Sequence, residues 1–166
     1  MASEHILRRE QVIPRPRSEV FAFFADAANL DRITPPWLHF RILTPQPMTI
    51  ARGALIDYRI RWRGLPLRWR TRIEEWLPET RFVDMQIHGP YALWHHTHVF
   101  EPAPNGTHMT DIVRYRIPFG PIGALLHRLR IRRDVEAIFD YRTQAIDRIF
   151  GASEPTASRS AQAMGE

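Results

Sequence analysis

The sequence predicts an α+β fold in which a curved, seven-stranded antiparallel sheet wraps around one long C-terminal helix. The main observation is that residues 107–117 alternate like a strand, residues 118–121 form a Pro-Phe-Gly-Pro corner, and an amphipathic helix then reaches about residue 150. Further strand-like segments precede this unit, and two short helical segments separate the first strand from the second. A long helix laid across such a sheet leaves a gap, so we expect a ligand cavity between the two.

The first two elements follow from local spacing. Residues 4–13 alternate loosely and end before a proline, which predicts an opening strand. In the next segment Val20, Phe21 and Phe24 have helical spacing, which predicts a helix over residues 18–25.

A second short helix and a meander of strands come next. Asp26 can cap a helix over residues 27–33, which the following Thr-Pro-Pro ends. Glycine, proline or asparagine in the later gaps supplies the chemistry of tight reversals. The expected strands cover residues 40–43, 55–63, 67–77, 81–88, 92–100 and 107–117. The final helix should be about 40 Å long, because its apolar residues recur at three- and four-residue steps up to residue 150.

Composition limits the domain organisation and the chemistry. With 166 residues, 44% of them hydrophobic, the chain can bury roughly two-thirds of its unfolded surface around one core. We expect one ligand-binding domain over residues 1–150 and a disordered tail over residues 151–166. The charged N-terminus and the lack of a long apolar run indicate a cytoplasmic protein. Cysteine and lysine are both absent, which excludes disulfides, thiolate chemistry and a lysine Schiff base.

Alternation separates two faces of the strands over residues 55–63 and 67–77. One face carries the mostly apolar side chains of Ile56, Tyr58, Ile60, Trp62, Trp69, Thr71 and Ile73. The other carries six arginines, namely Arg59, Arg61, Arg63, Arg68, Arg70 and Arg72. We expect the arginine face to point outward, as a solvated surface or, alternatively, as a site for an anionic partner.

The strand over residues 107–117 places a carboxylate on its apolar face. Asp111 alternates in phase with Met109, Val113 and Tyr115. A carboxylate in a cavity wall loses hydration and needs a partner, so Asp111 is the most informative single residue of this strand.

The neighbouring histidine run can supply that partner. His95 points to one side of its strand, whereas His96 and His98 point to the other. Both faces of this strand contain apolar groups, so alternation alone does not decide which histidines face the cavity.

Several short segments, taken with the order of elements, allow a comparison with known folds. They are Val20-Phe21-Ala22-Phe23-Phe24, Ile33-Thr34-Pro35-Pro36-Trp37, Gly89-Pro90-Tyr91, Trp94-His95-His96-Thr97-His98 and Tyr115-Arg116-Ile117-Pro118-Phe119-Gly120. The chain thereby resembles the helix-grip fold of the SRPBCC superfamily, which includes START lipid-transfer domains, birch-pollen-allergen-type proteins, polyketide cyclase/dehydrases and coenzyme Q-binding proteins. Within it, these segments look like a bacterial ligand-binding or cyclase/dehydrase-like subgroup. The resemblance covers residues 3–150 and implies that Leu93, His95 and Thr97 face inward.

Four interpretations of the histidine run are open. His96 and His98 could hold a metal ion, but no third ligand is evident and the superfamily that the chain resembles is mostly metal-free, so we expect no metal and no cofactor. His95 and Asp111 could form the acid/base pair of an aldol-type cyclisation or a dehydration. They could instead form a polar pair that is structural or orients a ligand oxygen. Finally, the histidines could lie on the convex surface.

We expect the protein to bind or transport a small hydrophobic or amphipathic molecule, such as a lipid, a quinone or a polyketide-like compound. The expected ligand contacts are Tyr58, Trp62, Trp69, Met85, Tyr91, Leu93, Thr97, Met109, Val113, Tyr115 and, as a lid, Phe119. Asp84 and Gln86 would join them only if their strand carries a bulge. A cyclase/dehydratase-like enzyme is the first alternative. An arginine surface that binds an anionic membrane or, less favoured, nucleic acid is the second.

Overall fold

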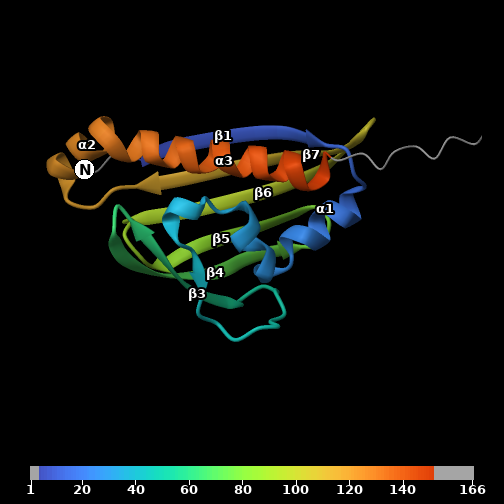
Figure 1. The fold of residues 1–166 in the computed structure, drawn as a ribbon, viewed down its shortest axis with the longest axis horizontal. Coiled ribbons are helices and arrows are strands. Elements are labelled where there is room, and N and C mark those ends of the chain that lie inside the picture. Colours follow the sequence, from blue (N-terminus) through green and yellow to red (C-terminus); the bar gives the residue numbers. More distant parts are fainter. Residues whose placement is uncertain (1–3, 152–166) are drawn as a thin grey trace, which may run out of the picture.

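One seven-stranded antiparallel sheet forms the body of the protein (Figure 1). The structure is a computed structural model and describes residues 4–151. The strand order is β1-β7-β6-β5-β4-β3-β2. The first and last strands are therefore neighbours, and each strand from β3 to β7 pairs with the strand before it in the sequence. The strands are β1 (Glu4–Ile13), β2 (Arg41–Ile42), β3 (Leu55–Trp62), β4 (Leu65–Leu77), β5 (Arg81–His88), β6 (Leu93–Ala103) and β7 (Gly106–Arg116). The expected fold is confirmed.

Short helices fill the connection between β1 and β2. They are the α-helix α1 (Arg17–Phe24) and the 3₁₀ helices η1 (Ala27–Ile33) and η2 (Pro36–Leu38). The expected cap is present, because the Asp26 carboxylate accepts a 2.9 Å hydrogen bond from the backbone N–H of Ala28. The second helix is nevertheless a 3₁₀ helix, and the second strand is shorter than expected, with two paired residues rather than four.

The C-terminal helix crosses the concave face of the sheet (Figure 1). It consists of α2 (Gly120–Leu126), a π-helical turn labelled η3 (His127–Ile131) and α3 (Arg132–Phe150). Its buried residues Val135, Phe139 and Ile146 face the sheet. Two polar contacts join α3 to β1, where Arg9 and Gln11 donate hydrogen bonds of 2.9 and 3.0 Å to aspartates of the helix. The continuous helix expected from the sequence thus contains one widened turn.

Three apolar clusters lie between the sheet and the helices. The largest cluster, centred on Phe100, packs α1 against β6, β7 and the end of α3. The second is centred on Val113 and packs β7 against the start of α3. These two clusters lie mainly on the β1, β7 and β6 side of the sheet, which α3 covers. The third and smallest cluster, with Ala27, Ile56 and Ile73, packs η1 against β3 and β4, and that half of the sheet is left more open.

A bulge in β4 changes which of its own residues face inward. Ile73 is opposite Asp84 and Glu75 is opposite Val83, so Glu74 is an extra residue in β4. As a result Ile73 and Trp76, three residues apart, both pack on the concave side. On β5, Asp84 is opposite Ile73 and in phase with Phe82, so it faces the cavity described below.

Within residues 4–151, no helix is long and apolar enough to cross a lipid bilayer. The tail that the sequence predicts to be disordered lies, apart from Gly151, outside the described residues.

Candidate functional site

A cavity of about 410 Å³ lies between the open half of the sheet and the C-terminal helix. Strands β3 to β6 form its walls, and η1 and the α2 to α3 region close it. Its lining is mainly apolar and aromatic, with Tyr58, Trp62, Trp69, Tyr91, Trp94 and Phe139 supplying rings. The volume falls in the range of small-molecule sites, which is typically 300–1,000 Å³.

Five of the expected contacts line this cavity, namely Tyr58, Trp62, Trp69, Tyr91 and Phe119. Phe119 precedes α2 with a φ of 72°, a left-handed conformation that is uncommon for a bulky residue. Its side chain is 77% exposed, so it lies at the mouth of the cavity rather than inside it. The hydroxyl of Tyr58 lies 3.5 Å from that of Thr71, and burial raises the pKa of Tyr58 and of Tyr91, so both phenols stay protonated.

Four other expected residues lie on the opposite, convex face. Met85 is paired with His95 across β5 and β6, and neither lines the cavity. Leu93 and Thr97 have the same parity as His95 and share its face. Their inward orientation was inferred by resemblance, and the structure corrects it. The physical reason is that the large Trp94 and Phe100 belong to the other parity and are drawn into the concave side, which turns His96 and His98 inward with them.

Three further expected contacts face the helix but do not reach the cavity. Met109, Val113 and Tyr115 are buried beneath α1 and α3, in the two larger apolar clusters. Tyr115 shares a 2.9 Å hydrogen bond with His127 of the π-helical turn. They fill the core because β7 lies at the side of the sheet that the C-terminal helix covers.

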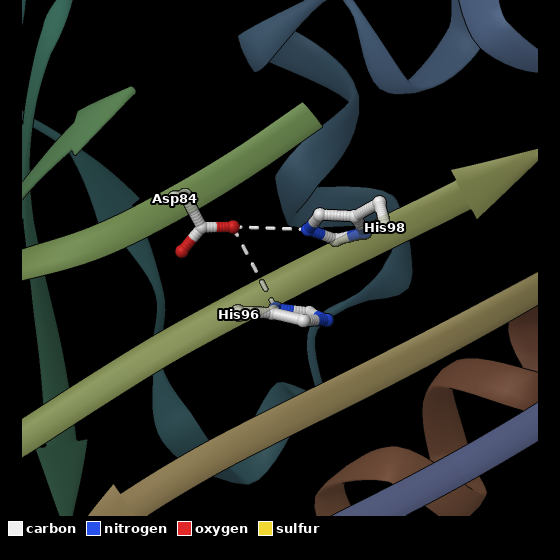
Figure 2. A group of neighbouring side chains, drawn as sticks. All are labelled: Asp84, His96 and His98. Carbon is white, nitrogen blue, oxygen red and sulfur yellow. Dashed lines mark hydrogen bonds and ion pairs between the residues drawn. The ribbon is translucent and has the colours of Figure 1, made fainter. Parts of the chain in front are cut away.

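A buried polar cluster forms one wall of the cavity (Figure 2). Asp84 Oδ2 lies 2.9 Å from His98 Nε2 and 3.6 Å from His96 Nδ1. On the other side of the rings, Asp111 Oδ1 lies 2.8 Å from His96 Nε2 and 2.9 Å from His98 Nδ1. The contact with His98 Nδ1 lacks the alignment of a hydrogen bond, and we treat it as an electrostatic contact. Each imidazole therefore lies between the same two carboxylates.

Burial and charge act in opposite directions within this cluster. Burial, followed by the nearby His98, lowers the pKa of His96. Burial would also lower the pKa of His98, but its contacts with Asp111 and Asp84 outweigh burial and raise that pKa. Burial would raise the pKa of both carboxyl groups, but His96 lowers the pKa of Asp84, and Arg142 with the histidines lowers that of Asp111 well below its usual value. The shifts thus favour the carboxylate forms of Asp84 and Asp111, the protonated form of His98 and the neutral form of His96.

Buried N–H groups on the cavity wall lack acceptors. Within residues 4–151, these include Trp69 Nε1 and the Nε and Nη2 atoms of Arg142. Arg142 Nε lies 3.5 Å from Asp111 Oδ2, an ion pair without a hydrogen bond, and its guanidinium lies near the rings of Phe24 and Phe139. Buried donors are normally paired, so these groups indicate where a ligand could supply acceptor oxygens.

Five of the six arginines lie on the outward face of β3 and β4 as expected, whereas Arg63 lies in the turn after β3 and contacts Asp134 of α3; much of the charge is compensated. Arg70 is paired with Asp57, Arg72 with Glu74, and Arg63 lies 3.5 Å from Asp134. An open hollow of about 520 Å³ lies on this outer side, along β2 to β4. The positive surface available to an anionic partner is therefore smaller than the sequence suggests.

The sequence reasoning found Asp111 but missed its surroundings. His95 and Asp111 are not brought together, because His95 faces outward. Asp84 was missed because both faces of β5 carry apolar residues, and the inward face is that of Phe82 and Asp84 rather than that of Met85. Arg142 was missed because it lies among exposed arginines on an amphipathic helix. The signal available for both was a charged residue in phase with the apolar face of its element.

Comparisons with known proteins agree with this architecture. Residues 13–140 match the family model described as "Polyketide cyclase / dehydrase and lipid transport". No curated protein sequence matches the chain. Among solved structures, a protein from Chromobacterium violaceum has a TM-score of 0.70 at 14% identity, with 90% of this chain and 99% of that chain covered. A Thermus thermophilus protein has a TM-score of 0.64 at 22% identity, covering 90% and 100%. Ara h 8.0201 has a TM-score of 0.64 at 15% identity, covering 91% and 100%. These structures establish similarity of fold.

Proposed function

Because this chain belongs to the polyketide cyclase / dehydrase and lipid transport family, we propose that it binds a small, largely apolar molecule carrying oxygen acceptors in the cavity beneath its C-terminal helix. The observation that carries the proposal is an apolar cavity lined by Trp69 and Arg142, two residues whose buried N–H groups have no acceptor. The apolar lining supports affinity through burial of the ligand, and the donors support one orientation of it.

Arg142 supports a ligand with an anionic or strongly polar oxygen. Its guanidinium shares the charge of Asp111 with the two histidines, and two of its nitrogens remain without an acceptor. A carboxylate or a phenolate oxygen would pair with these donors and recover the hydrogen bonds that the buried arginine lacks.

The ring-lined walls favour a flat ring system over a plain acyl chain. Trp69 stands at 90° to Trp94 with ring centroids 5.3 Å apart, and it stacks with Tyr58 at 5.7 Å. Such walls make favourable face and edge contacts with another aromatic ring. Within the expected classes, an oxygenated quinone-like or polyketide-like molecule is the best fit.

Native mass spectrometry of the freshly purified, untagged chain tests this proposal. We expect an additional mass that dissociates on denaturation and is lost or reduced in Arg142→Met. The matched control is Arg148→Met, which alters an exposed arginine of the same helix. A wild-type protein that carries no bound molecule and takes up none from a set of hydroxylated naphthoquinones would contradict the proposal.

A cyclase/dehydrase-like reaction is the second candidate function. The observation that favours it is the 2.8 Å contact between His96 Nε2 and Asp111 at the cavity wall, because a carboxylate can orient an imidazole that moves a proton. Product analysis with reactive poly-β-keto compounds checks this candidate, using His96→Gln against the outward-facing His95→Gln. Equal conversion by both variants and the wild type would exclude a catalytic role for His96.

A further inference from the structure

Three side chains on two adjacent strands converge on one point of the cavity wall. Asp84 of β5 and His96 and His98 of β6 each offer one ligand atom, and these atoms lie within 4.8 Å of one another (Figure 2). We propose that this group binds a divalent first-row transition metal ion such as Zn²⁺, Co²⁺ or Fe²⁺. Two imidazoles and one carboxylate form a donor set suited to these ions.

The spacing of the donor atoms suits such an ion. Asp84 Oδ2 lies 2.9 Å from His98 Nε2 and 3.6 Å from His96 Nδ1. Bonds of about 2.1 Å at octahedral or tetrahedral angles place neighbouring donors about 3.0 to 3.4 Å apart. These two observed separations lie on either side of this range, and all three donor atoms lie within 4.8 Å of one another.

The other nitrogen of each imidazole lies close to one shared carboxylate, that of Asp111. Asp111 Oδ1 lies 2.8 Å from His96 Nε2 and 2.9 Å from His98 Nδ1. A proton on each of these nitrogens leaves His96 Nδ1 and His98 Nε2 with lone pairs directed to the side of Asp84. Metal-bound histidines commonly donate this other N–H to a carboxylate, which fixes the tautomer and the ring orientation. His96 Nε2 is placed to do so, whereas His98 Nδ1 has an electrostatic contact alone.

The remaining coordination positions of the ion would face the cavity. Asp84, His96 and His98 all line it, and the Asp84 side chain is 19% exposed, which gives an ion a path of entry. The sequence argued against a metal because no third ligand was evident, and Asp84 is that ligand. An ion here would add positive charge beside Arg142. An anionic oxygen of a bound molecule could then occupy one of the open coordination positions of the ion.

Titration of the untagged, chelator-treated chain with CoCl₂ and ZnCl₂ tests this proposal. Visible absorption reports the coordination of Co²⁺, and calorimetry gives the stoichiometry and affinity for Zn²⁺. We expect one ion per chain, with a loss of at least about tenfold in affinity in Asp84→Asn and His98→Gln. Asp111→Asn should weaken binding by about 10- to 100-fold, as for other carboxylates that support metal-bound histidines.

His95→Gln is the matched control, because His95 is adjacent in sequence but faces outward, and it should bind as the wild type does. Circular dichroism confirms that each variant is folded. Absence of Co²⁺ and Zn²⁺ binding by the wild type would overturn the proposal, whatever the variants do. Binding that survives in folded Asp84→Asn would also overturn it, since the ion would then lie elsewhere.

Discussion

Replacing Asp111 with asparagine should destabilise the protein without changing the shape of the side chain. The Asp111 side chain is only 8% exposed and contacts His96, His98 and Arg142 at 2.8, 2.9 and 3.5 Å. Removing one partner of a buried charge group typically costs about 3–5 kcal/mol. The lower end applies, because Asp84 still contacts His98. We therefore expect a loss of about 3 kcal/mol, or a fall of about 6–12 °C in Tm for a domain of this size.

The effect of this substitution should depend on pH. The pKa of Asp111 is well below its usual value in the folded state, so its carboxylate stabilises the fold above the unfolded pKa near 3.8. That stabilisation is lost as the pH falls through the lower, folded pKa. The difference between wild type and Asp111→Asn should therefore shrink below about pH 4.

Urea unfolding at pH 7 and pH 3 measures both effects, provided that the m-values of the two proteins agree. The control is Asp140→Asn, because Asp140 is 57% exposed in its pair with Arg9 and such pairs typically contribute less than about 1 kcal/mol. A loss below about 1 kcal/mol for Asp111→Asn, or an equal loss at both pH values, would refute the reasoning.

Three further predictions concern the core, a turn and the cavity. Phe100 is fully buried at the centre of the largest apolar cluster, so Phe100→Ala should lower the free energy of unfolding by about 3–5 kcal/mol in urea titrations. Gly106→Ala should cost more than about 2 kcal/mol, because φ is 142° and a Cβ would lie 2.0 Å from a backbone oxygen, whereas Gly53→Ala has open space and should cost about 1 kcal/mol. Comparison of their Tm values checks this, and equal losses would contradict it. Leu67→Trp should fill the cavity and abolish binding of the fluorescent dye 8-anilinonaphthalene-1-sulfonate, measured by fluorescence titration. Leu77→Trp, at an exposed position, should leave dye binding unchanged.

Much of the fold could be predicted from the sequence because its signals are local. Helical spacing placed Val20, Phe21 and Phe24 on the buried side of α1, and alternation placed Tyr58 and Trp69 on the concave face. Where the apolar and polar residues of a strand separate cleanly, as in β3 and β4, alternation determines orientation.

The candidate site was less predictable, because both faces of β6 carry apolar groups. The choice between His95 and His96 depends on which large side chains the rest of the fold buries, and Phe100 decides it. Asp84 faces the cavity because it is in phase with the buried Phe82 and opposite His96 of β6. The orientations of His96 and Asp84 are both tertiary effects. A one-residue error in the parity of a strand moves every contact predicted on that strand to the other face.

The indole N–H signals of the tryptophans offer the most direct measurement of ligand binding in the cavity. Two-dimensional ¹⁵N NMR spectra can be recorded while 8-anilinonaphthalene-1-sulfonate, an aromatic anion, is added to the protein. We expect the signals of Trp62, Trp69 and Trp94 to shift, because these rings line the cavity, while those of Trp37 and Trp76 stay unchanged because they do not. Shifts confined to the exposed Trp37, or no shifts at saturating dye, would contradict binding in the cavity.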